Sequence, residues 1–474
     1  MVHKCKRLIL LVFLLLFSVA CKKDTGGVQN PIPNFSVKAF PGFLEAEISW
    51  EVSGNDSSVL YSIYLENILV AQNITDQHFV FENLTEKTFY SGKVVATDNE
   101  NNTKEAGFSF ITLLAKPPAD FQLVTNAITS DSISISWEIP IDPQGSKVLF
   151  DIYLNNQIVR KDQTKPGLDL GGLEPHSVYY IKVVARNSFI KTTSSSMYFV
   201  TLAAGGAKLL HKNMVCQGLK REYGYYLPSG ISNTNPALLI YLHGAAGVAW
   251  PELTTSPLKD IAEREKFIFA MPQALKGTTS DGTYLQWNAH EVLAWDDVLF
   301  IENMVDALSA KYAININRIY LCGMSNGGFM TFYTVSRSNK FAAIAPMSGL
   351  MSNNIYVKYN TDWPLPLLYI HGTADDIVPY NGLSWMPPVE DVINFWVKNN
   401  NCDTIPTVTQ LPNVATNDGS TVTLFNYKGA IPKSEIYFYR INGGGHSIAG
   451  YEPGANQDFS AFEAIWDFVK TKSK

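Results

Sequence analysis

The sequence predicts a multidomain chain in which two all-β sandwiches are followed by an α/β domain with a mostly parallel sheet. Three observations support this prediction. Residues 33–202 contain two copies of one pattern of short, alternating segments. Residues 207–474 instead show continuous apolar runs that are separated by amphipathic helical patterns. The chain has 474 residues, which is long for one domain and sufficient for two or three.

Residues 1–20 are typical of an export signal. Basic residues precede an apolar run at 8–17, which is too short to span a membrane comfortably. Residues 18–21 resemble the cleavage motif of a bacterial lipoprotein signal, although leucine is usual where Ser18 stands. The resemblance implies a lipid on Cys21 and an exported protein anchored to the outer membrane, at the cell surface or in the periplasm. An ordinary cleavable signal with an incidental cysteine is the alternative. Residues 21–31 are expected to form a linker.

Composition excludes several functional classes. The net charge of -6 and the pI near 5.8, without a basic stripe, argue against a nucleic-acid partner. The chain contains no C-x-x-C pair and no H-E-x-x-H motif, so we expect no metal site. Cys322 lies on a buried strand pattern and is expected in the core. A disulfide between Cys216 and Cys402 stays open at this stage.

An internal repeat covers most of residues 33–202. The sequence IYL occurs at 63–65 and at 152–154, and segments 110–113 and 199–202 match at the same offset. The segments alternate apolar and polar residues, as half-buried strands do, and turn residues interrupt them. Short strands at this spacing predict two sandwiches, at residues 32–116 and 117–204.

Both copies resemble fibronectin type III domains, which are immunoglobulin-like sandwiches. The second copy carries the pattern of that family through Leu173, Pro175, Ser177 and Tyr179. The first copy departs from it, with Glu86 where the proline belongs. The resemblance implies spacer modules, and carbohydrate binding is the alternative that remains open.

Residues 207–474 predict the α/β domain. The continuous apolar runs at 237–242, 267–271 and 364–370 are typical of strands buried on both faces. Between them, apolar residues step by three and four, as at 298–312 and near 462–469, which predicts helices. Alternation of strands and helices favours a parallel sheet, and functional sites form at the carboxyl ends of such strands.

A G-x-S-x-G motif at Gly323–Gly327 is the strongest functional signal. A buried strand pattern at 318–322 precedes it and a helical pattern begins at Gly328. A strand, a sharp turn and a helix are the context of a nucleophile elbow, in which Ser325 would be exposed above the sheet. Glycine is needed on either side because the turn tolerates only small neighbours.

A serine hydroxyl needs a base, and the base needs a carboxylate that orients it. Asp375 follows the strand at 367–370, and His446 follows the strand at 436–441 and a run of glycines. The order Ser325, Asp375, His446 is that of a hydrolase triad. His243 and His371 each precede a glycine at a strand end and are expected to be structural.

An oxyanion hole requires two N–H donors aimed at the charge that develops on the carbonyl oxygen. Asn326 follows the nucleophile and should supply one donor. The loop after the strand at 238–242 should supply the other, from Ala245, with Gly244 adjacent.

These motifs together resemble the esterases of carbohydrate esterase family 1, which include polyhydroxybutyrate-depolymerase-type, feruloyl and acetylxylan esterases. The matching segments run from residue 221 to the C-terminus and include HG at 243–244, GMSNGG at 323–328, HGTAD at 371–375 and GGGH at 443–446. The resemblance implies an α/β-hydrolase at 207–474. It also implies a secreted serine carboxylic-ester hydrolase that acts through an acyl-enzyme on an ester of a polysaccharide or polyester, without a cofactor.

The pocket is less defined by the sequence. Trp250, Trp287, His290 and Trp385 fall on loops at the expected site face, where an aromatic wall would suit an aryl acyl group or a sugar ring. Packing within the loops is the alternative. The chain also departs from the resemblance around the pocket, at Ala245–Ala246 and at residues 447–450.

Two other functions remain open. A serine peptidase of the prolyl-oligopeptidase type also has a G-x-S-x-G-G elbow, but no propeller repeat precedes the elbow here. A surface glycan-binding protein with a vestigial hydrolase domain is the second alternative, and the complete set of Ser325, Asp375 and His446 weighs against it.

Overall fold

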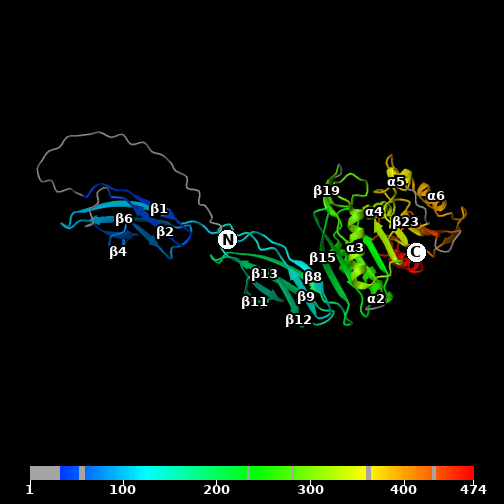
Figure 1. The fold of residues 1–474 in the computed structure, drawn as a ribbon, viewed down its shortest axis with the longest axis horizontal. Coiled ribbons are helices and arrows are strands. Elements are labelled where there is room, and N and C mark those ends of the chain that lie inside the picture. The colour runs from blue at the N-terminus through cyan, green and yellow to red at the C-terminus, as the bar shows by residue number, and fades with distance from the viewer. Residues whose placement is uncertain (1–31, 53–58, 232–234, 280–281, 359–363, 430–433) are drawn as a thin grey trace. The chain divides into compact units, whose positions relative to one another are not determined.

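The computed structural model describes residues 32–52, 59–231, 235–279, 282–358, 364–429 and 434–474 (Figure 1). The expected export signal, the linker at 21–31 and Cys21 lie outside these residues. The chain divides into two compact units, Met1–Pro117 and Pro118–Lys474.

The first unit is a β-sandwich. Trp50 and Tyr61 come from its two sheets and meet edge to face in the core, with ring centroids 5.2 Å apart. One sheet has the order β1-β2-β5 and the other the order β4-β3-β6-β7. The strands are β1 (Val37–Pro41), β2 (Ala46–Trp50), β3 (Leu60–Leu65), β4 (Ile68–Ile74), β5 (His78–Phe81), β6 (Phe89–Thr97) and β7 (Thr103–Ile111).

The second unit begins with a sandwich of the same strand order, which confirms the predicted repeat. Its sheets contain β12-β9-β8 and β11-β10-β13-β14. In both sandwiches a tyrosine hydroxyl accepts a backbone N–H five residues upstream, Tyr90 from Thr85 at 2.9 Å and Tyr179 from Glu174 at 2.8 Å. The strands are β8 (Val124–Ile128), β9 (Ser132–Ser136), β10 (Leu149–Leu154), β11 (Gln157–Gln163), β12 (Gly167–Gly171), β13 (Val178–Arg186) and β14 (Thr192–Val200).

The rest of the second unit is built on a sheet whose central strands, β18-β17-β21-β22-β23-β26, all run parallel. This confirms the predicted α/β class. Antiparallel strands extend it on both sides, β25 and β24 on one and β16 and β15 on the other, where β15 pairs with β8 of the second sandwich. The strands are β15 (Lys208–Cys216), β16 (Leu219–Leu227), β17 (Leu238–Leu242), β18 (Ile268–Pro272), β21 (Ile319–Met324), β22 (Ala343–Met347), β23 (Leu367–Gly372), β24 (Thr407–Gln410), β25 (Thr421–Tyr427) and β26 (Ile436–Asn442).

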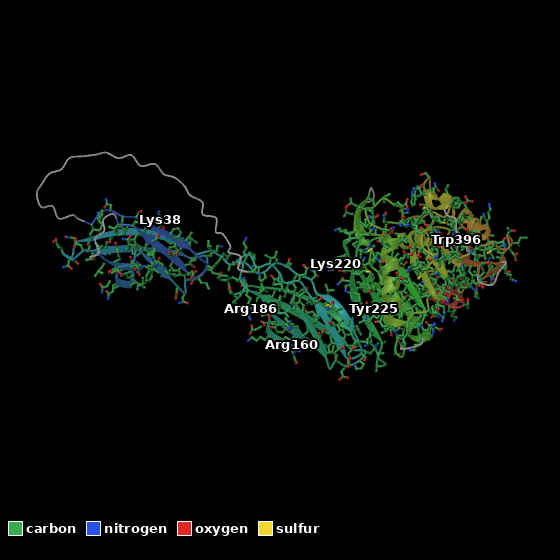
Figure 2. The ribbon with its side chains drawn as sticks, viewed as in Figure 1. Lys38, Arg160, Arg186, Lys220, Tyr225 and Trp396 are labelled. Carbon is green, nitrogen blue, oxygen red and sulfur yellow. The ribbon has the colours of Figure 1, made fainter. Side chains whose placement is uncertain are left out.

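Helices cover both faces of this sheet, so the strands β17, β18, β21, β22 and β23 are completely buried. Tyr225 of β16 and Trp396 of α6, both labelled in Figure 2, belong to the core on the face that α3 and α4 cover. The helices α1, α2 and α7 pack into the core on the other face. The helices are α1 (Ala249–Thr255), α2 (Pro257–Glu265), α3 (Asp297–Tyr312), α4 (Asn326–Val335), α5 (Asn353–Lys358), α6 (Val389–Asn399) and α7 (Ala461–Val469).

The helix predicted at 298–312 is α3, and its N-terminus shows why it starts there. Asp296 is the N-cap, and its carboxylate accepts the N–H groups of Val298 and Leu299. In the sequence, a hairpin of β19 (Leu275–Thr279) and β20 (Gly282–Gln286) lies between β18 and this helix. None of the described helices is long and apolar enough to cross a bilayer.

The cysteines in the described part of the chain are free thiols. Cys216 ends β15 and lies 3.5 Å from the side-chain amide of Asn303, whereas the thiol of Cys402 points to the carbonyl of Ser434 at 3.1 Å. The possible Cys216–Cys402 disulfide is therefore not formed. Cys322 is fully buried in β21, as predicted.

Candidate active site

Ser325 stands at the turn between β21 and α4. Its backbone has φ 56° and ψ -120°, a strained conformation for a residue with a side chain. A hydrogen bond of 2.9 Å from its N–H to the carbonyl of Met347 holds it there. A Cβ on Gly323 would lie 2.5 Å from the carbonyl oxygen of Gly327, and a Cβ on Gly327 would lie 2.0 Å from that of Leu242. Both glycines are therefore required by close backbone packing.

Asp375 and His446 are in direct contact, although they follow different strands, β23 and β26. The Nδ1–H of His446 donates to Oδ2 of Asp375 at 2.8 Å. Asp375 also accepts the N–H groups of Ile377 at 3.0 Å and Val378 at 2.8 Å. Burial opposes its ionisation, but the bonds from His446 and Val378 outweigh burial and hold the pKa of Asp375 below its ordinary value. The neighbouring Asp376 is exposed.

His243 and His371 are buried next to these groups and take structural positions. The backbone N–H of Ala274 donates to Nε2 of His243, so its Nδ1–H donates to the carbonyl of Gly244 at 2.7 Å. His371 donates from Nε2 to the carbonyl of Val378 at 2.8 Å. Burial lowers the pKa of both imidazoles to about 4, so both are neutral at pH 7.

The loop after β17 passes close to the serine. A Cβ on Gly244 would lie 3.5 Å from Cβ of Ser325, in ordinary contact. The N–H of Ala246 donates to the carbonyl of Leu285 at 2.8 Å and is already used. Asn326 begins α4, where the first N–H groups have no partner within the helix. Ala245 and Asn326 therefore flank the space beside the hydroxyl of Ser325.

Two cavities meet at Ser325. The larger has a volume of about 870 Å³ and the smaller of about 460 Å³. Ala245, Ser325 and Ile377 line both cavities, so the serine stands at their boundary. Among the described residues, His446 lines the smaller cavity only.

The larger cavity has an aromatic wall. The imidazole of His290 lies edge-on to Phe329 and to Trp385, with ring centroids 5.0 and 5.2 Å away. Burial lowers the pKa of His290 to about 4, so the ring is neutral. Its Nδ1 is buried and has no hydrogen-bond partner among the described residues. Trp385 is partly exposed, and can therefore contact a ligand.

Trp287 is a scaffold of this wall and not a surface for stacking. Its side chain is 1% exposed, and its indole N–H donates to the carbonyl of His243 at 2.9 Å. Its backbone N–H donates to the side-chain oxygen of Asn326 at 2.7 Å. Trp287 thus connects the loop after β17 with the start of α4.

Trp250, which the sequence placed in the same pocket, lies elsewhere. It belongs to α1, packs edge-on against His211 of β15 at 5.4 Å, and lines a separate hollow of about 810 Å³. Ser325 does not line that hollow. The prediction that Trp250 lies on a loop was wrong, because residues 249–255 form the helix α1.

Sequence reasoning missed a buried ion pair that supports the larger cavity. Arg221 of β16 donates to Asp297 at 2.6 Å, and both side chains are at most 1% exposed. The other carboxylate oxygen of Asp297 accepts the backbone N–H of Asn288 and the indole N–H of Trp295. The pair therefore anchors the loop that carries His290. The signal available in the sequence was the charge of Asp297 in the first turn of the predicted helix, but its partner Arg221 lies far away in the sequence.

We expect Arg221→Met to lower the melting temperature by about 10 °C, because it removes the counterion of the buried Asp297, at a cost of about 3–5 kcal/mol. Scanning calorimetry would measure the shift. Lys220→Met is the matched control, since Lys220 (Figure 2) is exposed and its ion pair with Glu222 is at the surface. Equal shifts for the two variants would contradict the assigned role of Arg221.

No cluster of His, Cys, Asp and Glu side chains within the described ranges is arranged to bind a metal ion. The site therefore consists of a strained serine, a buried aspartate–histidine pair, a nearby loop with backbone donors and two cavities.

Comparison with known proteins agrees with this arrangement. Residues 232–388 match the family model for phospholipase/carboxylesterase proteins, and residues 116–200 match the fibronectin type III domain. These matches confirm the two predicted resemblances, to an α/β-hydrolase of the carboxylesterase kind and to a fibronectin type III module.

Three curated relatives are esterases or a related depolymerase. The chain is 27% identical over 255 residues to a bifunctional acetylxylan esterase/xylanase of Neocallimastix patriciarum. The aligned segment covers 53% of this chain and 33% of that protein. It is 29% identical to feruloyl esterase B of Piromyces equi, covering 51% and 44%. It is also 29% identical to poly(3-hydroxyalkanoate) depolymerase C of Paucimonas lemoignei, covering 26% and 30%. The chain thus spans less than half the length of these relatives.

Proposed function

We propose that this protein is a serine carboxylesterase that cleaves ester groups on a polysaccharide, of the feruloyl or acetylxylan esterase type. The observation that carries the proposal is that Ser325 and His446 line one cavity, while Asp375 holds His446 from behind through a hydrogen bond. The relatives from Neocallimastix and Piromyces, an acetylxylan esterase/xylanase and a feruloyl esterase, support the same class of ester.

The proposed reaction begins when Oγ of Ser325 attacks the ester carbonyl and His446 takes the hydroxyl proton. The N–H groups of Ala245 and Asn326 donate to the oxyanion that forms, next to Gly244. Collapse of this intermediate breaks the ester bond, and the leaving alcohol takes the proton from His446. Water then attacks the acyl-enzyme while His446 takes a proton from it, and His446 returns this proton to Oγ of Ser325 as the acid leaves. Asp375 holds the imidazole in the tautomer that this cycle needs, and no cofactor takes part.

The larger cavity is proposed to hold the acyl group. Trp385, Phe329 and His290 offer an aromatic wall that suits an aryl acid better than acetate.

Export and attachment through a lipid on Cys21 complete the proposal. They are supported by the signal-like residues 1–21, and the sandwiches would hold the esterase away from the membrane. An external polymer is then the accessible substrate.

The proposal is tested by the release of acid from methyl ferulate, p-nitrophenyl acetate and butyrate, acetylated xylan and polyhydroxybutyrate. We expect turnover of methyl ferulate, and we expect Trp385→Ala to lower kcat/KM for this ester about tenfold or more relative to p-nitrophenyl acetate, since the variant removes an aromatic contact and buried area.

Trp250→Ala is the matched control for this test, because Trp250 lines the separate hollow. Its ratio of the two rates should stay within about twofold of wild type. No turnover of any ester would contradict the proposed function. Preference for polyhydroxybutyrate would move the substrate to polyesters, and a rate on a proline anilide above that on esters would favour a peptidase.

A further inference from the structure

The two cavities beside Ser325 have different places in the proposed reaction. His446 must give its proton to the oxygen of the leaving alcohol, so this oxygen has to lie on the side of the imidazole. The smaller cavity is the one that His446 lines. The alcohol part of the substrate therefore enters the smaller cavity, and the acyl part faces the larger one.

The smaller cavity contains a buried tyrosine with an unmet hydroxyl. Tyr241 of β17 is 5% exposed and lines the cavity, and its hydroxyl has no hydrogen-bond partner among the described residues. The carboxylates of Glu252 and Glu452 act on it electrostatically. Because Tyr241 lines the cavity, a hydroxyl without a protein partner is available there for a hydrogen bond with a ligand.

Two carboxyl groups line the same cavity. Glu252 extends from α1, and Glu452 follows His446 in the chain and accepts the N–H of Ile448 at 2.9 Å. Burial, together with the charge of Glu452, raises the pKa of Glu252 to about 7 against the effect of the N–H of Val248. At neutral pH Glu252 can therefore accept a hydrogen bond or donate one.

We propose that Tyr241, Glu252 and Glu452 form a subsite that recognises the hydroxyl groups of a sugar as the leaving alcohol. Sugar hydroxyls both donate and accept hydrogen bonds, and so match a hydroxyl and two carboxyl groups. A methyl or alkyl alcohol offers no further hydroxyl group to any of these three side chains. This inference rests on the proposed function and names the residues that would bind the sugar part of its substrate.

The test compares two esters that share one acyl group, methyl 5-O-feruloyl-arabinofuranoside and methyl ferulate. In wild type, kcat/KM should favour the sugar ester by about tenfold or more. Glu252→Gln should reduce this preference about tenfold, because the amide cannot replace the carboxyl group as acceptor and donor in the same geometry. Tyr241→Phe removes only a hydroxyl and should reduce the preference in the same direction, which keeps the test valid if Glu252→Gln does not fold.

Glu265→Gln is the matched control, because Glu265 ends α2 and pairs with Arg264 at the surface. Its preference should equal that of wild type. Turnover with no wild-type preference for the sugar ester, or with a preference that survives both Glu252→Gln and Tyr241→Phe, would overturn the subsite and leave the esterase intact. Failure of wild type to cleave either ester would overturn the esterase and the subsite together.

Discussion

Ser325→Ala is expected to lower kcat for aryl esters by about 10⁶-fold, because the variant removes the nucleophile and leaves only binding and the oxyanion donors. Alanine keeps a side chain at φ 56°, so the strain of the elbow remains and the melting temperature should change little. Ser325→Gly should be equally inactive and more stable, since glycine adopts positive φ freely. Rates with p-nitrophenyl acetate and scanning calorimetry would measure both effects.

The rate that remains in Ser325→Ala shows whether Ser325 is the nucleophile. A residual rate lower by about 10⁶-fold, still above the uncatalysed background, supports covalent catalysis by Ser325. Retention of about 1% of the activity or more would indicate another nucleophile and contradict the mechanism. A wild type without any turnover that still binds glycan tightly would instead favour the binding-protein alternative.

Asp375→Asn is expected to lower kcat by about 10⁴-fold, as an asparagine at the equivalent position of a triad holds the histidine in the wrong tautomer. The amide oxygen can still accept the N–H groups of Ile377 and Val378, so the loop should keep its shape. Asp376→Asn is the matched control, because Asp376 is the exposed neighbour of the buried carboxylate. We expect less than a twofold change there.

A comparable loss in both asparagine variants would show that the charge of this loop matters and not the contact with His446. A loss of activity in Asp376→Asn alone would show that Asp376, and not Asp375, orients His446. Steady-state rates at pH 7 on one aryl ester distinguish these outcomes.

The fold was predictable because its signals are local. The alternating strands of the sandwiches and the continuous apolar runs of β17, β18 and β23 each follow from the burial of one or both strand faces. The contact of Asp375 with His446 was also within reach, since both follow strands that end at the same edge of a parallel sheet. Glycines around Ser325 indicated the turn, because only they fit between the backbones that approach it.

The cavities could not be predicted, because they are made by segments far apart in the chain. Glu252 and Glu452 come from α1 and from the loop after His446, and only tertiary structure brings them to one cavity. The partner of Asp297 is Arg221 on an outer strand, which no local pattern reveals. Trp250 looked equivalent to Trp385 in the sequence, yet the helical turn of α1 directs it to another hollow.

Trp287 joins two segments of the site through hydrogen bonds, so these segments are expected to move together. Its indole N–H is bound to the carbonyl of His243 and its backbone N–H to the side chain of Asn326. A local opening of the loop after β20 would therefore release the segment of Ala245 and the start of α4 at the same moment. The proposed oxyanion donors and the wall of the larger cavity would then become mobile as one cooperative unit. A change that loosens the wall, and so admits other acyl groups, would also loosen the donors.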